Sequence, residues 1–210
     1  MAPKHKADFA FPVPIVSAII ERQRGKVTEV LVQVRWKPAK DPVYSGAFEI
    51  PAGGIGLYEN VYDAVKREVF EETGLRVTGF RPDVRTKTHS QKGDDVFAFV
   101  PFCCQQQLSG KARVGFVFVC TVEGTDPVPA RDEVKEITWL GMSELKRLLK
   151  ESPERIFTFQ LPVLDFYVSH ARMRRGQGAG PWGAEIFPSV SRTPNSAVER
   201  TRLARRSPQR

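Results

Sequence analysis

Between residues 53 and 75, glycines, glutamates and one arginine recur at fixed intervals in the run GGIGLYENVYDAVKREVFEETGL. If this run is helical, Glu68, Glu71 and Glu72 fall within an arc of about 100°. The last turns of a helix are the least favourable place for anions, by roughly 0.3–1 kcal/mol each, so the cluster costs stability unless a cation joins it. Such carboxylates suit Mg²⁺ held together with substrate phosphates. The alternative is a solvated acidic face on which Arg67 pairs with Glu71.

The complete pattern is G-x5-E-x7-R-E-U-x-E-E-x-G-U, where U is a bulky aliphatic residue. It resembles the signature of the Nudix hydrolases, which use divalent metal to cleave a nucleoside diphosphate linked to another group. The residues at the specified positions are Gly53, Glu59, Arg67, Glu68, Val69, Glu71, Glu72, Gly74 and Leu75. A match at all of them favours a metal site over a solvated helix face.

The resemblance implies a role for each charged residue of the motif. Glu72 and Glu71 are expected to be the main ligands of Mg²⁺ or Mn²⁺, and Glu68 either a further ligand or the base that activates the attacking water. Arg67 is expected to orient the carboxylates. Glu59 is expected either to contact the metal-binding residues without binding the main metal itself, or to bind an additional metal ion.

The segment GAFEIPAGG reads as a short strand that runs into a tight glycine loop. Gly53 and Gly54 allow the backbone to approach a phosphate or a metal closely. The resemblance makes the backbone carbonyl of Ala52 a metal ligand. The loop departs from the commonest family sequence at two unspecified positions, with Gly56 where glutamate is frequent and Tyr58 where glycine is frequent, so its shape and substrate fit should differ.

A later acidic loop, EGTDPVPARDEVKEITWL, offers further ligands or an alternative base. We expect this role for Glu133 or Glu136, against the competing interpretation that both are solvated surface residues. His89 lies in a polar stretch from which it could reach a phosphate, although a lone loop histidine more often has no such role.

The motif also indicates its own helix, because Asn60 suits an N-cap and Gly74 suits the left-handed residue past the C-terminus. This helix should span residues 61–73. Apolar or alternating runs predict strands at residues 14–20, 27–35, 47–50, 96–102, 114–121 and 136–140, and further helices at 142–150 and 162–172. Because strands and helices do not alternate regularly, we expect a mixed β-sheet between helices, which is also the α/β/α sandwich that the Nudix resemblance implies.

The charge distribution divides the chain into three parts. Residues 172–210 hold nine arginines and two acidic residues, a net charge of +7, so residues 1–171 carry only +1 of the total +8. We expect a short N-terminal extension (1–11), a catalytic domain (12–171) and a disordered basic tail (172–210). The tail could attract nucleic acid, or it could simply be a solubilising segment.

Several features favour a cytoplasmic protein without a membrane span. No apolar run approaches the 18 or more residues that a bilayer crossing needs, and two prolines interrupt the only run resembling a signal peptide. Cys103 and Cys104 are adjacent on an expected strand and Cys120 is a third thiol, so buried reduced cysteines are expected. A monomer and a homodimer are equally compatible with this sequence.

The expected function is metal-dependent hydrolysis of a pyrophosphate bond in a small nucleotide. The segment FEIPAGG resembles the corresponding segment of ADP-ribose and nucleotide-sugar hydrolases more than that of enzymes that cleave nucleoside triphosphates. The alternatives are a nucleoside triphosphate pyrophosphohydrolase, or a protein associated with nucleic acid or the RNA cap that uses its arginine-rich tail. Base recognition should fall to residues outside the motif, and the candidates are Arg35, Trp36, Phe48 and Tyr58.

Overall fold

The computed structural model describes residues 11–81, 86–124 and 126–176, with side chains as far as His170. Nearly all of the expected N-terminal extension and of the expected tail lies outside these residues. The fold described below is that of the compact unit that ends at Ser169.

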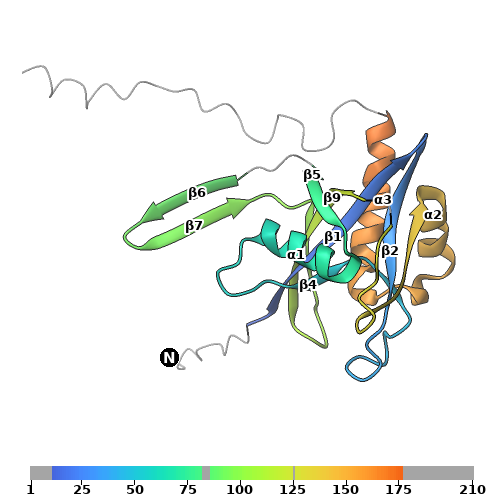
Figure 1. Ribbon diagram of the computed structural model, residues 1–210, viewed down its shortest axis with the longest axis horizontal. Helices are drawn as coiled ribbons and strands as arrows, with labels where there is room; N and C mark the ends of the chain where they lie inside the picture. The colour runs from blue at the N-terminus through green and yellow to red at the C-terminus, as the bar shows by residue number, and fades with distance from the viewer. Residues whose placement is uncertain (1–10, 82–85, 125, 177–210) are drawn as a thin grey trace, which may run out of the picture. The chain divides into compact units, whose positions relative to one another are not determined.

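One mixed sheet forms the centre of this unit, with the strand order β10-β2-β1-β9-β5 (Figure 1). The short strands β3, β4 and β8 pair with β2, β1 and β9, respectively. The strands are β1 (Val13–Arg24), β2 (Val27–Arg35), β3 (Phe48–Glu49), β4 (Ala52–Gly54), β5 (Arg76–Arg81), β8 (Cys103–Gln106), β9 (Arg113–Glu123) and β10 (Val134–Gly141). The β1–β9 pair is parallel, whereas the other pairs are antiparallel, which confirms the mixed sheet.

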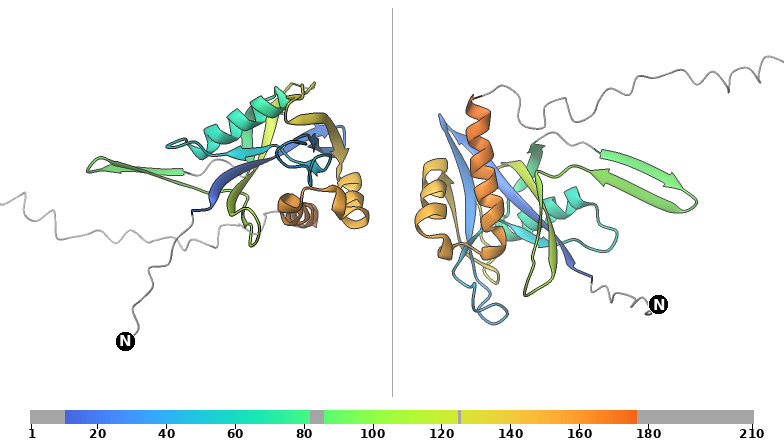
Figure 2. Two further views of the ribbon diagram at one scale, coloured as in Figure 1. Left: turned by 90° about the horizontal axis from the view of Figure 1, so that it is seen from below. Right: turned by 180° about the vertical axis from the view of Figure 1, so that it is seen from behind.

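Helices cover both faces of this sheet, as expected for an α/β/α sandwich. Helix α1 (Val61–Thr73) lies on one face, and α2 (Met142–Glu151) and α3 (Leu161–Gly176) lie on the other (Figure 2). Two short 3₁₀ turns, Pro153–Arg155 and Thr158–Gln160, connect α2 to α3. No helix in the described part of the chain combines the length and the apolar character that a bilayer crossing requires.

The alternation of side chains along β1 explains why both of its faces are apolar. Val16, Ala18 and Ile20 point to the face that packs against Val65 and Val69 of α1. The intervening Ile19 is completely buried on the opposite face. A central strand of a sheet covered on both sides must be apolar at successive positions, and this requirement accounts for the continuous run that predicted the strand.

Helix α1 begins and ends at the residues that the sequence predicts. The side chain of Asn60 accepts a hydrogen bond from the backbone N–H of Tyr62 at 2.9 Å. Gly74 has a φ of 70°, in the left-handed region, and its N–H donates to the carbonyl of Phe70. These two caps fix the ends of the helix that carries the acidic motif.

The strand expected over residues 96–102 is present as β7 (Asp94–Phe99), which ends before Val100. It pairs with β6 (Thr86–Gln91), which was not expected, in a hairpin separate from the main sheet and joined through Lys92 and Gly93, both at positive φ. The polar sequence of β6 gave no strand signal because every one of its residues is exposed.

Two smaller expectations also change. Cys104 on β8 is exposed, because this strand lies outside the central part of the sheet, so only Cys120 fits the expectation of a fully buried thiol. Helix α3 continues to Gly176, so the first residues of the segment assigned to the tail by composition are helical.

Candidate functional site

The glycine loop and helix α1 place the acidic motif beside the end of β1. Strand β4 is held by pairing with β1, with Val16 opposite Gly53 and Ile15 opposite Gly54. The carboxylate of Glu68 lies directly over Gly53, where an added Cβ would meet its Cδ atom at 2.0 Å. Only glycine therefore leaves room for this carboxylate at the loop.

Arg67 joins three of the motif's carboxylates. Its Nε and Nη2 donate to the two oxygens of Glu59 at 2.8 and 2.9 Å, and its Nη1 donates to Glu68 at 2.6 Å and to Glu71 at 3.1 Å. Nη2 also donates to the carbonyl of Gly54 at 2.8 Å. The hydrogen bonds from Arg67 lower the pKa of Glu59 to about 2, so Glu59 stays ionised and fixes the guanidinium by a two-point contact.

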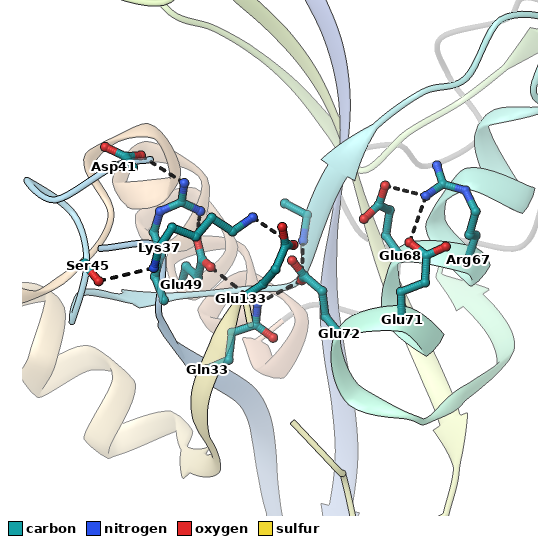
Figure 3. A network of polar contacts seen from close by, with 12 residues as sticks. Gln33, Lys37, Asp41, Ser45, Glu49, Arg67, Glu68, Glu71, Glu72 and Glu133 are labelled. Carbon is teal, nitrogen blue, oxygen red and sulfur yellow. Dashed lines mark hydrogen bonds and ion pairs between the residues drawn. The ribbon is translucent and has the colours of Figure 1, made fainter. Parts of the chain in front are cut away.

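Glu72 lies apart from this arginine and is buried, with only 3% of the residue exposed. Its carboxylate accepts hydrogen bonds from Nε2 of Gln33 at 2.8 Å and from the backbone N–H of Ala52 at 3.1 Å (Figure 3). The pKa of Glu72 is raised to about 8. Burial is the largest cause, and the nearby carboxylate of Glu49 is the second. Burial also raises the pKa of Glu49, whose carboxylate accepts from Arg35 at 3.1 Å. The site thus holds more buried negative charge than its own cations offset.

The chemistry of these donors fits a hard divalent cation. Carboxylate oxygens are the ligands that Mg²⁺ and Mn²⁺ prefer, and a cation would offset the charge that Glu72 and Glu49 bury together. As the side chains stand, no three acidic, histidine or cysteine residues of the described ranges form a ligand set. In Figure 3, Arg67 holds Glu68 and Glu71 on the side away from Glu72.

The later acidic loop contributes one of its two expected residues. Glu133 pairs with Lys37 at 2.9 Å, and its charge adds to the burial that chiefly raises the pKa of Glu68. Glu136 is exposed and lies opposite Val34 in the β10–β2 pair. Successive residues of a strand point to opposite faces, so Glu136 faces away from the side on which Gln33 meets Glu72.

His89 is not brought to the acidic motif by any contact of the described residues. It lies on the exposed strand β6, and its Nε2 is 3.4 Å from the side-chain oxygen of Gln91 on the same strand. We therefore leave both His89 and Glu136 out of the proposed site.

Two residues near the motif, Gln33 and Lys37, were not assigned from the sequence. Gln33 is completely buried and bridges Glu72 and Glu49, with its Nε2 3.4 Å from the latter. Lys37 lies close enough to Glu72 and Glu49 for its charge to lower the pKa of both carboxyls. The sequence feature that could have indicated Gln33 is its position as the single amide in the apolar run VLVQV. A buried polar side chain in such a strand needs a hydrogen-bond partner.

Tyr58 stands in the left-handed region, with a φ of 63°, while its side chain is 98% exposed. Tyr58→Gly should raise the free energy of unfolding by about 0.5–1 kcal/mol. The left-handed conformation costs a non-glycine residue roughly 1–2 kcal/mol, and glycine avoids this cost. Part of the gain is offset because glycine loses more backbone entropy on folding than tyrosine does. Urea denaturation measures the difference. Leu57→Gly is the matched control, because Leu57 is also exposed but has no positive φ, and it should lower stability. A less stable Tyr58→Gly protein would contradict the strain argument.

The contact between Gly53 and Glu68 gives a second prediction. Gly53→Ala should lower kcat at least about tenfold with little change in Tm, because the new Cβ displaces a flexible carboxylate rather than the core. At the neighbouring Gly54 a Cβ would meet no atom within 4 Å, so Gly54→Ala should cost at most about threefold. Steady-state kinetics and thermal unfolding of both variants test this, and equal losses in the two would show that the Glu68 contact is unimportant.

A pocket of about 530 Å³ adjoins the glycine loop. Residues 52–54 form part of its wall together with Glu49. Its other walls carry basic side chains, namely Arg35, Lys37, Lys111 and Arg113, and the aromatic rings of Phe11, Phe157 and Phe159. A pocket with this lining, next to clustered carboxylates, can hold an anionic molecule that also has a planar group.

Comparisons with known proteins point to one family and one fold. The NUDIX domain family model matches residues 12–161. A MutT NUDIX hydrolase from Burkholderia pseudomallei is 18% identical with a TM-score of 0.51, over 74% of this chain and 98% of that chain. A NUDIX hydrolase from Nitrosomonas europaea is 20% identical with a TM-score of 0.54, over 82% of this chain and 77% of that chain.

A third similar structure is the NUDIX domain of Shewanella oneidensis NrtR in complex with ADP-ribose. It is 15% identical with a TM-score of 0.52, over 80% of this chain and 90% of that chain. Identities this low show a shared fold. No curated protein matches the chain.

Proposed function

Because this chain belongs to the Nudix family, whose members cleave pyrophosphate bonds in nucleoside diphosphate derivatives, we propose that it hydrolyses ADP-ribose or a nucleotide sugar with the help of Mg²⁺ or Mn²⁺. The observation that carries the proposal is the placement of Glu68 and Glu72 on either side of the glycine loop, Glu68 over Gly53 and Glu72 against Ala52. A mixed pocket of rings and basic groups beside that loop supports a nucleotide substrate. The Shewanella domain that binds ADP-ribose shares the fold.

The metal would be held by Glu72, Glu71 and Glu68, with the carbonyl of Ala52 as a further ligand. When bound, the metal supplies charge neutralisation at the phosphates and lowers the pKa of water. Glu133 is the additional ligand or base that we propose from the later loop, because its charge already acts on Glu68. Gln33 would fix the orientation of the Glu72 carboxylate through the hydrogen bond at 2.8 Å.

Arg67 and Glu59 have positioning roles in this proposal. Both carboxylate oxygens of Glu59 are engaged by the guanidinium, so Glu59 aligns Arg67 and is not free to bind the primary metal. Arg67 in turn holds Glu68 and Glu71 at the loop. Burial is the largest cause of the raised pKa of Glu68, and a carboxylate with a raised pKa is the stronger base, so we propose Glu68 as the base.

The test is a panel of ADP-ribose, nucleotide sugars, nucleoside triphosphates, dinucleoside polyphosphates and capped RNA, assayed with Mg²⁺ and with Mn²⁺. We expect mononucleotide release to be fastest with ADP-ribose or a nucleotide sugar, as measured by kcat/KM. A kcat/KM at least tenfold higher for a triphosphate or capped RNA would replace the proposed substrate class with that one.

A further inference from the structure

The pocket beside the glycine loop contains basic groups of two kinds. Arg35 is paired with Asp41 at 2.9 Å and with Glu49 at 3.1 Å, and Lys37 is paired with Glu133 at 2.9 Å. These two cations are therefore already neutralised.

Lys111 and Arg113 differ from this first pair. Among the described residues, neither makes an ion pair with a carboxylate, although both line the same pocket. The pocket therefore has two positive charges that no carboxylate neutralises, in addition to the paired charges of Arg35 and Lys37. A ligand with only one diphosphate at the motif would leave them unused.

Two phenylalanine rings lie beside the guanidinium of Arg113. Its guanidinium carbon lies 5.8 Å from the ring centroid of Phe157 and 5.6 Å from that of Phe159. Residue 115 is a glycine, where a Cβ would lie 2.9 Å from Cγ of Gln105 and 3.3 Å from Cζ of Phe159, so both side chains pack closely over this position. The Nη1 of Arg113 donates to the side-chain oxygen of Gln107 at 3.4 Å, which leaves the other N–H groups of the guanidinium to donate to a phosphate.

The register of the sheet gives the spacing between the two anion sites. Ile15 lies opposite both Gly54 on β4 and Gly115 on β9, so these glycines are two strand spacings apart, or about 10 Å. Arg113 is two residues before Gly115, about 7 Å along the strand, which places its Cα roughly 12 Å from the glycine loop. An arginine side chain that extends towards the loop covers about half of this distance, and the remaining roughly 6 Å is about the length of one sugar ring.

We propose that Lys111 and Arg113 bind a third phosphate, carried on a sugar of the substrate, and that the enzyme prefers nucleoside diphosphate derivatives with a phosphorylated ribose. This inference rests on the proposed function, because it assumes that the scissile diphosphate lies at the glycine loop. It narrows the substrate class within the ADP-ribose type to phosphorylated members.

The test compares substrates that differ by one phosphate on the ribose. The pairs are ADP-ribose 2′-phosphate against ADP-ribose, NADPH against NADH, and coenzyme A against dephospho-coenzyme A. In the wild-type protein, at least one pair should show a kcat/KM at least about tenfold higher for the phosphorylated member, since charge-assisted hydrogen bonds are the strong class. The preference should shrink between 50 and 500 mM salt. Lys111 is exposed and Arg113 is partly exposed, so salt screens their attraction for a phosphate.

The Lys111→Gln/Arg113→Gln double variant should reduce this ratio to near one. Lys150→Gln is the matched control, since Lys150 is an exposed cation on α2 outside the pocket, and it should keep the wild-type ratio. If the double variant does not fold, the proposal is tested by the wild-type protein alone, through the kcat/KM ratio within each pair and the dependence of this ratio on salt. Equal kcat/KM within every pair, or a ratio kept by the double variant, would overturn the third-phosphate site while leaving the proposed hydrolysis intact. If no diphosphate in any pair or in the wider panel is cleaved, the proposed function itself fails.

Discussion

Glu72→Gln should lower kcat by at least about two orders of magnitude, because it removes the charge of the most buried carboxylate in the proposed metal site. An amide retains an oxygen that can accept from Gln33 and Ala52, so the hydrogen bonds at 2.8 and 3.1 Å should persist. The measurement is steady-state hydrolysis of the best substrate at saturating Mg²⁺.

The control for this experiment is Glu136→Gln, which makes the same chemical change on the opposite face of the sheet. It should keep kcat within about twofold of the wild-type value. A Glu72→Gln enzyme with wild-type turnover would remove Glu72 from the active site.

The same Glu72→Gln substitution should stabilise the metal-free protein at pH 8. The folded-state pKa of Glu72, about 8, lies above the ordinary glutamate value, so this group stabilises the fold when protonated and loses that contribution as the pH rises towards 8. A neutral glutamine avoids the loss. We expect a Tm higher by roughly 3 °C or more at pH 8 and a smaller difference at pH 5. Thermal unfolding with EDTA at both pH values measures this, and a destabilised variant at pH 8 would contradict it.

Removal of divalent metal has the second largest expected effect. EDTA should lower turnover by at least about two orders of magnitude, and excess Mg²⁺ or Mn²⁺ should restore it, because in the proposed site Glu68, Glu71 and Glu72 would bring negative charge next to the phosphates of the substrate. Without a cation, these groups repel the substrate.

Metal binding can be followed separately from catalysis by thermal unfolding. A ligand that binds only the folded state raises Tm with its concentration, so Mn²⁺ should stabilise the wild-type protein more than Glu72→Gln. Full turnover in EDTA would eliminate the metal-dependent mechanism. Equal stabilisation of both proteins by Mn²⁺ would place the metal away from Glu72.

Local patterns in the sequence were sufficient for the elements that carry the motif. Asn60 and Gly74 cap helix α1 as predicted, because capping depends on the backbone of a few neighbouring residues. The apolar runs of β1 and β2 predicted buried strands, because a sheet covered on both faces requires continuous apolar sequence. The strand β6 was missed, because an exposed hairpin imposes no such requirement on its side chains.

The sequence by itself determined the family, the helix with its glutamates, and the glycine loop, since all of these lie within one continuous segment whose spacing is fixed by covalent connectivity. Only the tertiary structure decided which distant side chains join them. It brought Gln33 and Lys37 to Glu72, turned Glu136 to the other face, and opened a pocket between the loop and Arg113. Strand register and helix packing govern these contacts, and both depend on burial summed over the whole sheet rather than on any local pattern.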